Sequence, residues 1–234
     1  MLEQAFDALK TYDWGVDRNV LNPIDEAVVK TRNDPAARKE IESRLLAVLQ
    51  SNAPRDARDY VCRQLRAMGT AASVPVLEPL LADAELSHMA RYALERIPEP
   101  QAGQALERQL PKLSGNLKIG VISSLGSRGQ AAPAKTVALL RPLLKDPDDA
   151  VACAAATALG RIASVEADKA LASAKPRAAL VAVFADASMS CAENLLAAGH
   201  VREAKATYER LLKNKPSDLV RLAAERGLKA CQRG

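Results

Sequence analysis

Aromatic residues are scarce in this chain: 2 Phe, 4 Tyr and 1 Trp make up 3% of its 234 residues. Strands are rich in aromatic and β-branched residues, whereas this sequence is rich in Ala and Leu, which suit closely packed helices. A chain of this length is long enough for one extended array of helices or for two small cores. The composition therefore predicts an all-α fold.

Cysteine and histidine are also rare. The four cysteines are Cys62, Cys153, Cys191 and Cys231. They lie far apart and form no CxxC pair, which excludes a disulfide scaffold and a zinc site of the usual spacing. The two histidines, His88 and His200, belong to no HExxH motif. We therefore expect free thiols buried in helices, no metal, no cofactor and no catalytic residue.

Other signatures are missing as well. The glycines occur singly, so there is no phosphate-binding loop. The opening segment MLEQAFDALK is amphipathic and carries acids, unlike a signal peptide, and no apolar run reaches the roughly 18 residues that a membrane span requires. We expect a soluble protein without a membrane span, and the compartment stays open.

The charge balance is mild. Lys and Arg number 33 against 28 Asp and Glu, giving a formal charge of +5, and the excess lies in residues 131–234, with 16 basic and 11 acidic residues. A dedicated nucleic-acid binder carries a denser basic stripe. We therefore expect the partner to be another protein rather than nucleic acid.

What the sequence does contain is an internal repeat. Four segments each predict a helix that ends in a leucine near a small residue: RDYVCRQLRAMG from Arg58, SHMARYALERIP from Ser87, LKIGVISSLGSR from Leu117 and DAVACAAATALGRI from Asp149. The reference leucines are Leu65, Leu94, Leu125 and Leu159, followed less clearly by Leu195 and Leu228. Their spacings of 29, 31, 34, 36 and 33 residues are typical of two-helix repeats. Shorter apolar segments from Ser73 and Lys135 supply the first helices of such pairs.

This pattern predicts a right-handed α-solenoid, an α-α superhelix of about six helical hairpins, as a single domain over residues 1–234. Residues 1–53 are predicted as capping helices, 54–174 as regular repeats and 175–234 as further hairpins. We expect Asp146 and Pro147 to begin a helix, as N-cap and first-turn residue. Gly69 and Gly199 are predicted to end helices in the left-handed conformation.

The clearest copy of the repeat, LLRPLLKDPDDAVACAAATALGRI, resembles the HEAT-repeat consensus. The segment SHMARYALERI is similar to segments of bacterial HEAT-repeat proteins of the phycobilisome-lyase-like kind. The later stretch AENLLAAGHVREAKATYERLLKNKP resembles the second half of a tetratricopeptide unit, with Gly199, Ala204, Tyr208, Leu212 and Pro216 at its marker positions. These resemblances imply a solenoid that binds through its curved surface, and they transfer no catalytic residue.

Function is therefore expected on the outer side of the second helices. Helical spacing buries Val61, Leu65 and Met68. The repeat offsets then define a ladder of outward positions: Asp59, Arg63 and Arg66; His88, Tyr92 and Glu95; Ile119, Ser123 and Gly126; Cys153, Thr157 and Gly160. We predict that its polar end forms a partner-binding face of Asp59, Arg63, Arg66, His88, Arg91, Tyr92 and Glu95. The alternative is an ordinary solvated helix surface.

The sequence thus favours a non-catalytic scaffold or adaptor for protein–protein interaction, and its ending GLKACQRG is compatible with a module of a longer polypeptide. One rival is a nucleic-acid-binding or DNA-glycosylase-like HEAT protein. Against it, Trp14 lies outside the regular repeats, where we expect it to staple a capping helix. The other rival is a bilin-type small-ligand lyase, for which no residue predicts a tetrapyrrole pocket. The iron-dependent hydroxylase built on HEAT repeats requires His-Glu pairs that this sequence lacks.

Overall fold

The computed structural model describes residues 1–129, 134–214 and 216–232. These residues form helices joined by turns and contain no strand, which confirms the all-α prediction. Lys215 of the tetratricopeptide-like stretch and the last two residues of GLKACQRG lie outside the described residues. The chain divides into two compact units, Met1–Leu113 (unit 1) and Ser114–Gly234 (unit 2). A single domain, with the internal boundaries given above, stays a prediction.

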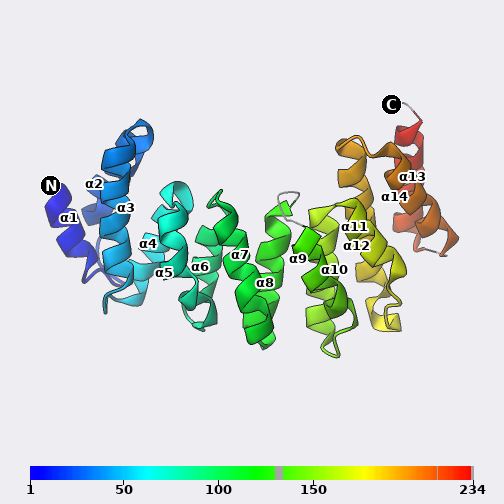
Figure 1. The fold of residues 1–234 in the computed structure, drawn as a ribbon, viewed down its shortest axis with the longest axis horizontal. Coiled ribbons are helices and arrows are strands. Elements are labelled where there is room, and N and C mark those ends of the chain that lie inside the picture. Colours follow the sequence, from blue (N-terminus) through cyan, green and yellow to red (C-terminus); the bar gives the residue numbers. More distant parts are fainter. Residues whose placement is uncertain (130–133, 215, 233–234) are drawn as a thin grey trace. The chain divides into compact units, whose positions relative to one another are not determined.

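Unit 1 is a series of helices in which neighbours in sequence pack side by side (Figure 1). Its elements are α1 (Leu2–Leu9), η1 (Arg18–Leu21), α2 (Asn22–Lys30), η2 (Thr31–Asn33), α3 (Pro35–Leu49), α4 (Arg55–Met68), η3 (Ala71–Ser73), α5 (Val74–Leu77), η4 (Pro79–Ala82), α6 (Ser87–Leu94), α7 (Pro100–Gln109) and η5 (Leu110–Lys112). Helix α7 is an element that the repeat pattern did not predict.

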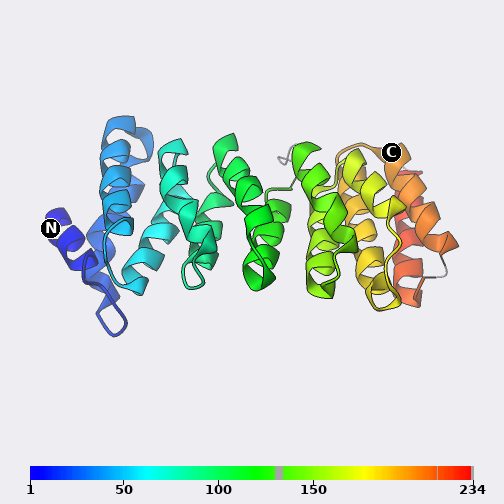
Figure 2. The same ribbon diagram turned by 60° about the horizontal axis from the view of Figure 1, so that its bottom comes forward.

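Unit 2 has the same kind of construction, and its helices also lie against their sequence neighbours (Figure 2). Its elements are α8 (Gly115–Ser127), α9 (Ala134–Leu140), η7 (Arg141–Lys145), α10 (Asp149–Ile162), α11 (Val165–Ser173), η8 (Ala178–Leu180), α12 (Val181–Ala197), α13 (Val201–Lys213) and α14 (Asp218–Cys231). The second helices α8, α10 and α12 pack in succession and form the centre of this unit.

The first helices are shorter than predicted because proline ends them. The apolar segment from Ser73 gives the single turn α5 followed by a 3₁₀ turn that begins at Pro79. The segment from Lys135 likewise ends α9 at Leu140, and Pro142 lies in the 3₁₀ turn that follows. Proline lacks an N–H and its ring clashes with the preceding turn, so an α-helix stops before it.

The predicted leucine register describes the core well. Leu65, Leu94, Leu125, Leu159 and Leu195 are buried, together with Val61 and Met68 on α4. Leu228 departs from the register, since it is only partly buried near the end of α14. The repeat therefore predicts the core of five second helices.

Two predicted helix ends differ in detail from the structure. Asp146 accepts a hydrogen bond from the backbone N–H of Asp148, as expected, but Asp148 is the N-cap of α10, and its side chain accepts from the backbone N–H of Ala150. Pro147 therefore precedes the helix instead of lying in its first turn. Gly199 is left-handed, with φ 85°, but Gly69 has φ −59°. A Cβ on Gly69 would lie 2.9 Å from Ile97 Cδ1, so close packing explains this glycine.

One helical stretch, Ala178–Ala197, is long and apolar enough by length and composition to cross a membrane, although no such run was predicted. About 44% of its most apolar window is buried inside the structure, and α12 packs against α10, α11, α13 and α14. Core helices of soluble proteins pass the same test, so this stretch is weak evidence for a membrane span.

Candidate interaction face on helices α4 and α6

The predicted face lies on two second helices of unit 1 that pack against each other. Helix α4 carries Asp59, Arg63 and Arg66. Helix α6 carries His88, Arg91 and Tyr92, and Glu95 is its C-cap. The ladder positions of these two repeats thus lie on adjacent helices, as the repeat offset of 29 residues predicts.

The contact that joins the two helices at this face is a cation–π pair. The guanidinium carbon of Arg66 lies 4.3 Å from the centre of the Tyr92 ring. No carboxylate among the described residues forms an ion pair with Arg66, and its buried Nε has no hydrogen-bond partner there. Tyr92 therefore orients a cation whose charge is left for a further acceptor.

The neighbouring Arg63 is held by its own helix. Its Nε and Nη2 donate to the two carboxylate oxygens of Asp59, at 3.1 and 3.2 Å. This hydrogen-bonded pair, with smaller contributions from the charge of Asp59 and from Tyr92, raises the pKa of Arg63 above its ordinary value. Asp59 thus fixes Arg63 in a fork geometry and neutralises part of its charge.

The remaining three residues form the other side of the face. Arg91 Nη2 lies 3.4 Å from His88 Nδ1, and His88 is exposed. Burial lowers the pKa of Arg91, and the charge of Glu95 opposes that change. Arg91 is therefore a half-buried residue that supports the face, whereas His88 is available at its edge.

Cys62 lies behind this face and is fully buried. Burial, assisted by the nearby Asp59 carboxylate, raises the pKa of the Cys62 thiol to about 12. A thiol with this pKa stays protonated at neutral pH and is a poor nucleophile. The adjacent arginines in the sequence do not activate it.

Only part of the ladder is exposed in unit 2. Ser123 and Thr157 are exposed, but Gly126 and Gly160 are buried. A Cβ on Gly126 would lie 2.7 Å from Ala158 Cα, and one on Gly160 would lie 2.6 Å from the carbonyl oxygen of Ala187. At both glycines two helices approach closely. The last residue of each ladder group therefore faces outward only in unit 1.

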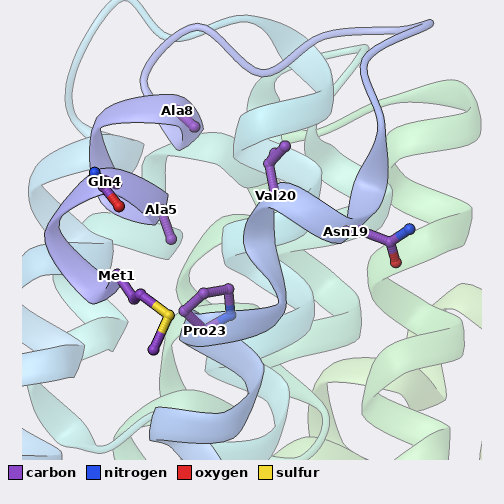
Figure 3. Close-up of a pocket in the computed structure, with 7 residues that line it drawn as sticks. All are labelled: Met1, Gln4, Ala5, Ala8, Asn19, Val20 and Pro23. Atoms are coloured by element: carbon purple, nitrogen blue, oxygen red, sulfur yellow. The ribbon is translucent and has the colours of Figure 1, made fainter.

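Trp14 does not staple a capping helix as predicted, because its side chain is 90% exposed in the turn between α1 and η1. A pocket of about 340 Å³ lies between α1 and the segment of η1 and α2 (Figure 3). Its lining contains no acidic or basic side chain and consists of Met1, Gln4, Ala5, Ala8, Asn19, Val20 and Pro23.

Two buried carboxylates that join helices of different hairpins were not predicted. Glu42 accepts hydrogen bonds from the backbone N–H and the hydroxyl of Thr70, at 2.8 and 3.0 Å. Asp168 accepts from Thr207 Oγ1 and Arg210 Nη2, both at 2.7 Å. The donors lie 28 to 42 residues after the acid in the sequence, so an acid followed by polar donors at such separations is the signal that could have found these sites.

Residues 109–185 match the family model of HEAT repeats. The likeness to HEAT repeats is thus shown for this segment of the chain. Its match begins at the end of α7 and includes the close-packed helices α8 and α10. No curated protein matches the chain. Within the residues that the structure describes, no group of three or more His, Cys, Asp or Glu side chains is placed to hold a metal ion.

Similar solved structures include an engineered protein, with 20% sequence identity and a TM-score of 0.43 over 90% of this chain and 96% of that one. Human deoxyhypusine hydroxylase in complex with glycerol is similar over 100% of this chain and 96% of its own, with 15% identity and a TM-score of 0.39. Both likenesses are too distant to indicate a function for this chain.

Proposed function

We propose that this chain is a non-catalytic protein-interaction module that binds its partner through the face on α4 and α6. HEAT repeats generally mediate protein–protein interactions, and their stacked helices present extended surfaces for them. Unit 1 adds a local reason, because its second helices carry arginine, tyrosine and histidine at the outward positions. Arg and Tyr are among the residue types that contribute most to interface energies.

The observation that carries the proposal is the stacking of Arg66 on Tyr92. A long arginine side chain normally loses rotamer freedom when it enters an interface, which opposes binding. Here the ring holds the guanidinium before any partner arrives, and the Asp59 carboxylate does the same for Arg63. The face is thus pre-organised, and the uncompensated charge of Arg66 favours a partner that presents a carboxylate.

The test is affinity capture from a lysate of the organism that encodes the chain, comparing the wild type with an Arg63→Ala, Arg66→Ala, Tyr92→Ala variant. The matched control is Lys10→Ala, Lys30→Ala, Trp14→Ala, which also removes two exposed cations and one aromatic side chain. Circular dichroism checks that all three proteins have equal helix content.

We expect a partner that the wild type and the control retain and that the face variant loses, with affinity reduced at least about thirtyfold in a follow-up titration. A partner retained equally by the face variant contradicts the proposal. Retention of nucleic acid alone, falling steeply with added salt, assigns the chain to the nucleic-acid-binding class instead.

A further inference from the structure

Unit 2 contains a groove that is separate from the α4 and α6 face. It has a volume of about 590 Å³ and lies at the loop ends of the last hairpins, between the start of α12 and the junction of α13 with α14. The connection from α11 to α12 closes one side. Most of its lining is apolar, with Phe184 and Leu211 at the buried base.

The walls of this groove contain large apolar side chains that are not covered by other residues of unit 2. Val181 on α12 is 53% exposed and Leu219 on α14 is 81% exposed, and both line the groove. Leu222, three residues after Leu219 on α14, is 55% exposed and extends the strip outside it. The apolar stretch Ala178–Ala197 is likewise less than half buried in its most apolar window. Contiguous apolar surface of this kind marks a contact site.

The groove also carries a charge that the described structure does not neutralise. Its described lining contains two ionisable side chains, Asp186 and Arg210. Arg210 donates to Asp168 Oδ1 at 2.7 Å and to Thr207 Oγ1 at 3.3 Å, so its charge is used within the unit. Asp186 is exposed and forms no ion pair or hydrogen bond with the described residues. The described lining therefore presents one carboxylate, that of Asp186, which no described residue pairs, beside an apolar base.

We propose that this groove binds a peptide segment of another protein, which inserts at least two large apolar side chains between α12 and α14 and places a lysine or arginine against Asp186. The apolar side chains would cover Val181 and Leu219, and the basic residue would complement the carboxylate. A small molecule confined to the groove would leave Leu222 in water, since this residue lies outside the lining. The site lies wholly in unit 2 and is independent of the face in unit 1.

The experiment uses a displayed library of random 16-residue peptides, selected on the intact chain with counter-selection against the Leu219→Glu variant. Leu219 and Asp186 are both exposed, so their substitution leaves the core intact. Enriched peptides are expected to share two or more large apolar residues and one lysine or arginine. One of them is then synthesised and titrated by fluorescence anisotropy.

The charge is tested by a swap. Asp186→Lys is expected to weaken binding of the selected peptide about tenfold, and replacing the peptide's basic residue by glutamate is expected to restore binding to this variant. The matched control is Glu166→Lys, which makes the same change in charge at an exposed site on α11 that does not line the groove. This variant is expected to bind as the wild type does.

Three results overturn the proposal. One is a library without enrichment over the counter-selected pool. Another is a peptide that binds the Asp186→Lys and Leu219→Glu variants as tightly as the wild type. The third is a dimer in sedimentation equilibrium that Leu219→Glu dissociates, because it assigns the apolar strip to a second copy of this chain.

Discussion

The last position of each ladder group is occupied by a long charged side chain in unit 1 and by glycine in unit 2. In unit 1 it is filled by Arg66, whose guanidinium stacks on the adjacent helix. In unit 2 it is filled by Gly126 and Gly160, which meet the backbone of the next helix at distances that leave no room for a Cβ. The repeat offset therefore predicts which residues are equivalent in successive repeats, but it does not predict whether they are exposed. Side-chain size at the contact decides whether the position becomes surface or packing.

The leucine register is the feature that both units share, so it should give the largest effect. Replacing the fully buried Leu159 by Ala is expected to reduce the free energy of unfolding by about 2–5 kcal/mol, because it removes buried methyl groups and leaves a cavity. Urea denaturation followed by circular dichroism measures it. Leu228→Ala is the control, expected to cost less than about 1 kcal/mol because this residue is only partly buried. Equal losses would show that the register does not define the core.

The glycine contacts of unit 2 should give the next largest effect. Gly160→Val is expected to cost about 1–3 kcal/mol of unfolding free energy, since its Cβ would meet the backbone of Ala187. The matched change in unit 1, Arg66→Val, is expected to cost less than about 1 kcal/mol, because this position lies on the surface side of α4. Thermal unfolding of the two variants compares them. If Arg66→Val proved as costly as Gly160→Val, the contrast between the units would fail.

A surface ion pair of unit 1 should give a smaller and pH-dependent effect. Hydrogen bonds from Arg108 lower the pKa of Glu78, with burial opposing the shift. A carboxyl whose pKa is lowered by folding contributes stability above its unfolded pKa and loses that stability as the pH falls through its folded pKa. Arg108 is half exposed, so we expect only about 0.5–1 kcal/mol.

The measurement is the unfolding free energy of the wild type and Glu78→Gln between pH 6 and pH 3. The difference between the two proteins should shrink as the pH falls. A difference that stays constant over this range would mean that the ion pair contributes nothing.

The cysteines distinguish the units without changing their stability. Burial raises the pKa of Cys62 in unit 1 and of Cys191 in unit 2 to about 12, so both thiols should stay protonated at pH 8. Cys153 and Cys231 of unit 2 are only partly buried. Labelling with iodoacetamide followed by mass spectrometry should therefore modify these two first. Early labelling of Cys62 would show that the α4 core opens.

The sequence predicts the second helices well because these helices are long enough to show a periodic pattern and their leucines recur from repeat to repeat. It fails at the first helices, where Pro79 and Pro142 convert the later part of an apolar segment into a 3₁₀ turn. It also misses α7, which lies outside the segments that carry the repeat.

The candidate face was predicted for unit 1 by helical spacing alone, but the same spacing wrongly placed Gly126 and Gly160 on the outer side of their helices, where both are buried. Spacing identifies the side of a helix, and it says nothing about how close the next helix comes. The groove beside Asp186 could not be predicted, because its walls come from two connections and helix α12, which only the folded chain brings together.

The unequal lengths of the paired helices have a kinetic consequence. In one pair α5 has 4 residues and α6 has 8, and in another α9 has 7 and α10 has 14. Helices as short as α5 and α9 do not persist alone in water, so they form only while their partners hold them. In each of these hairpins the short first helix therefore depends on packing against the longer second helix. We expect local unfolding to begin in these short first helices. The second helices, which carry the α4 and α6 face, are expected to unfold last.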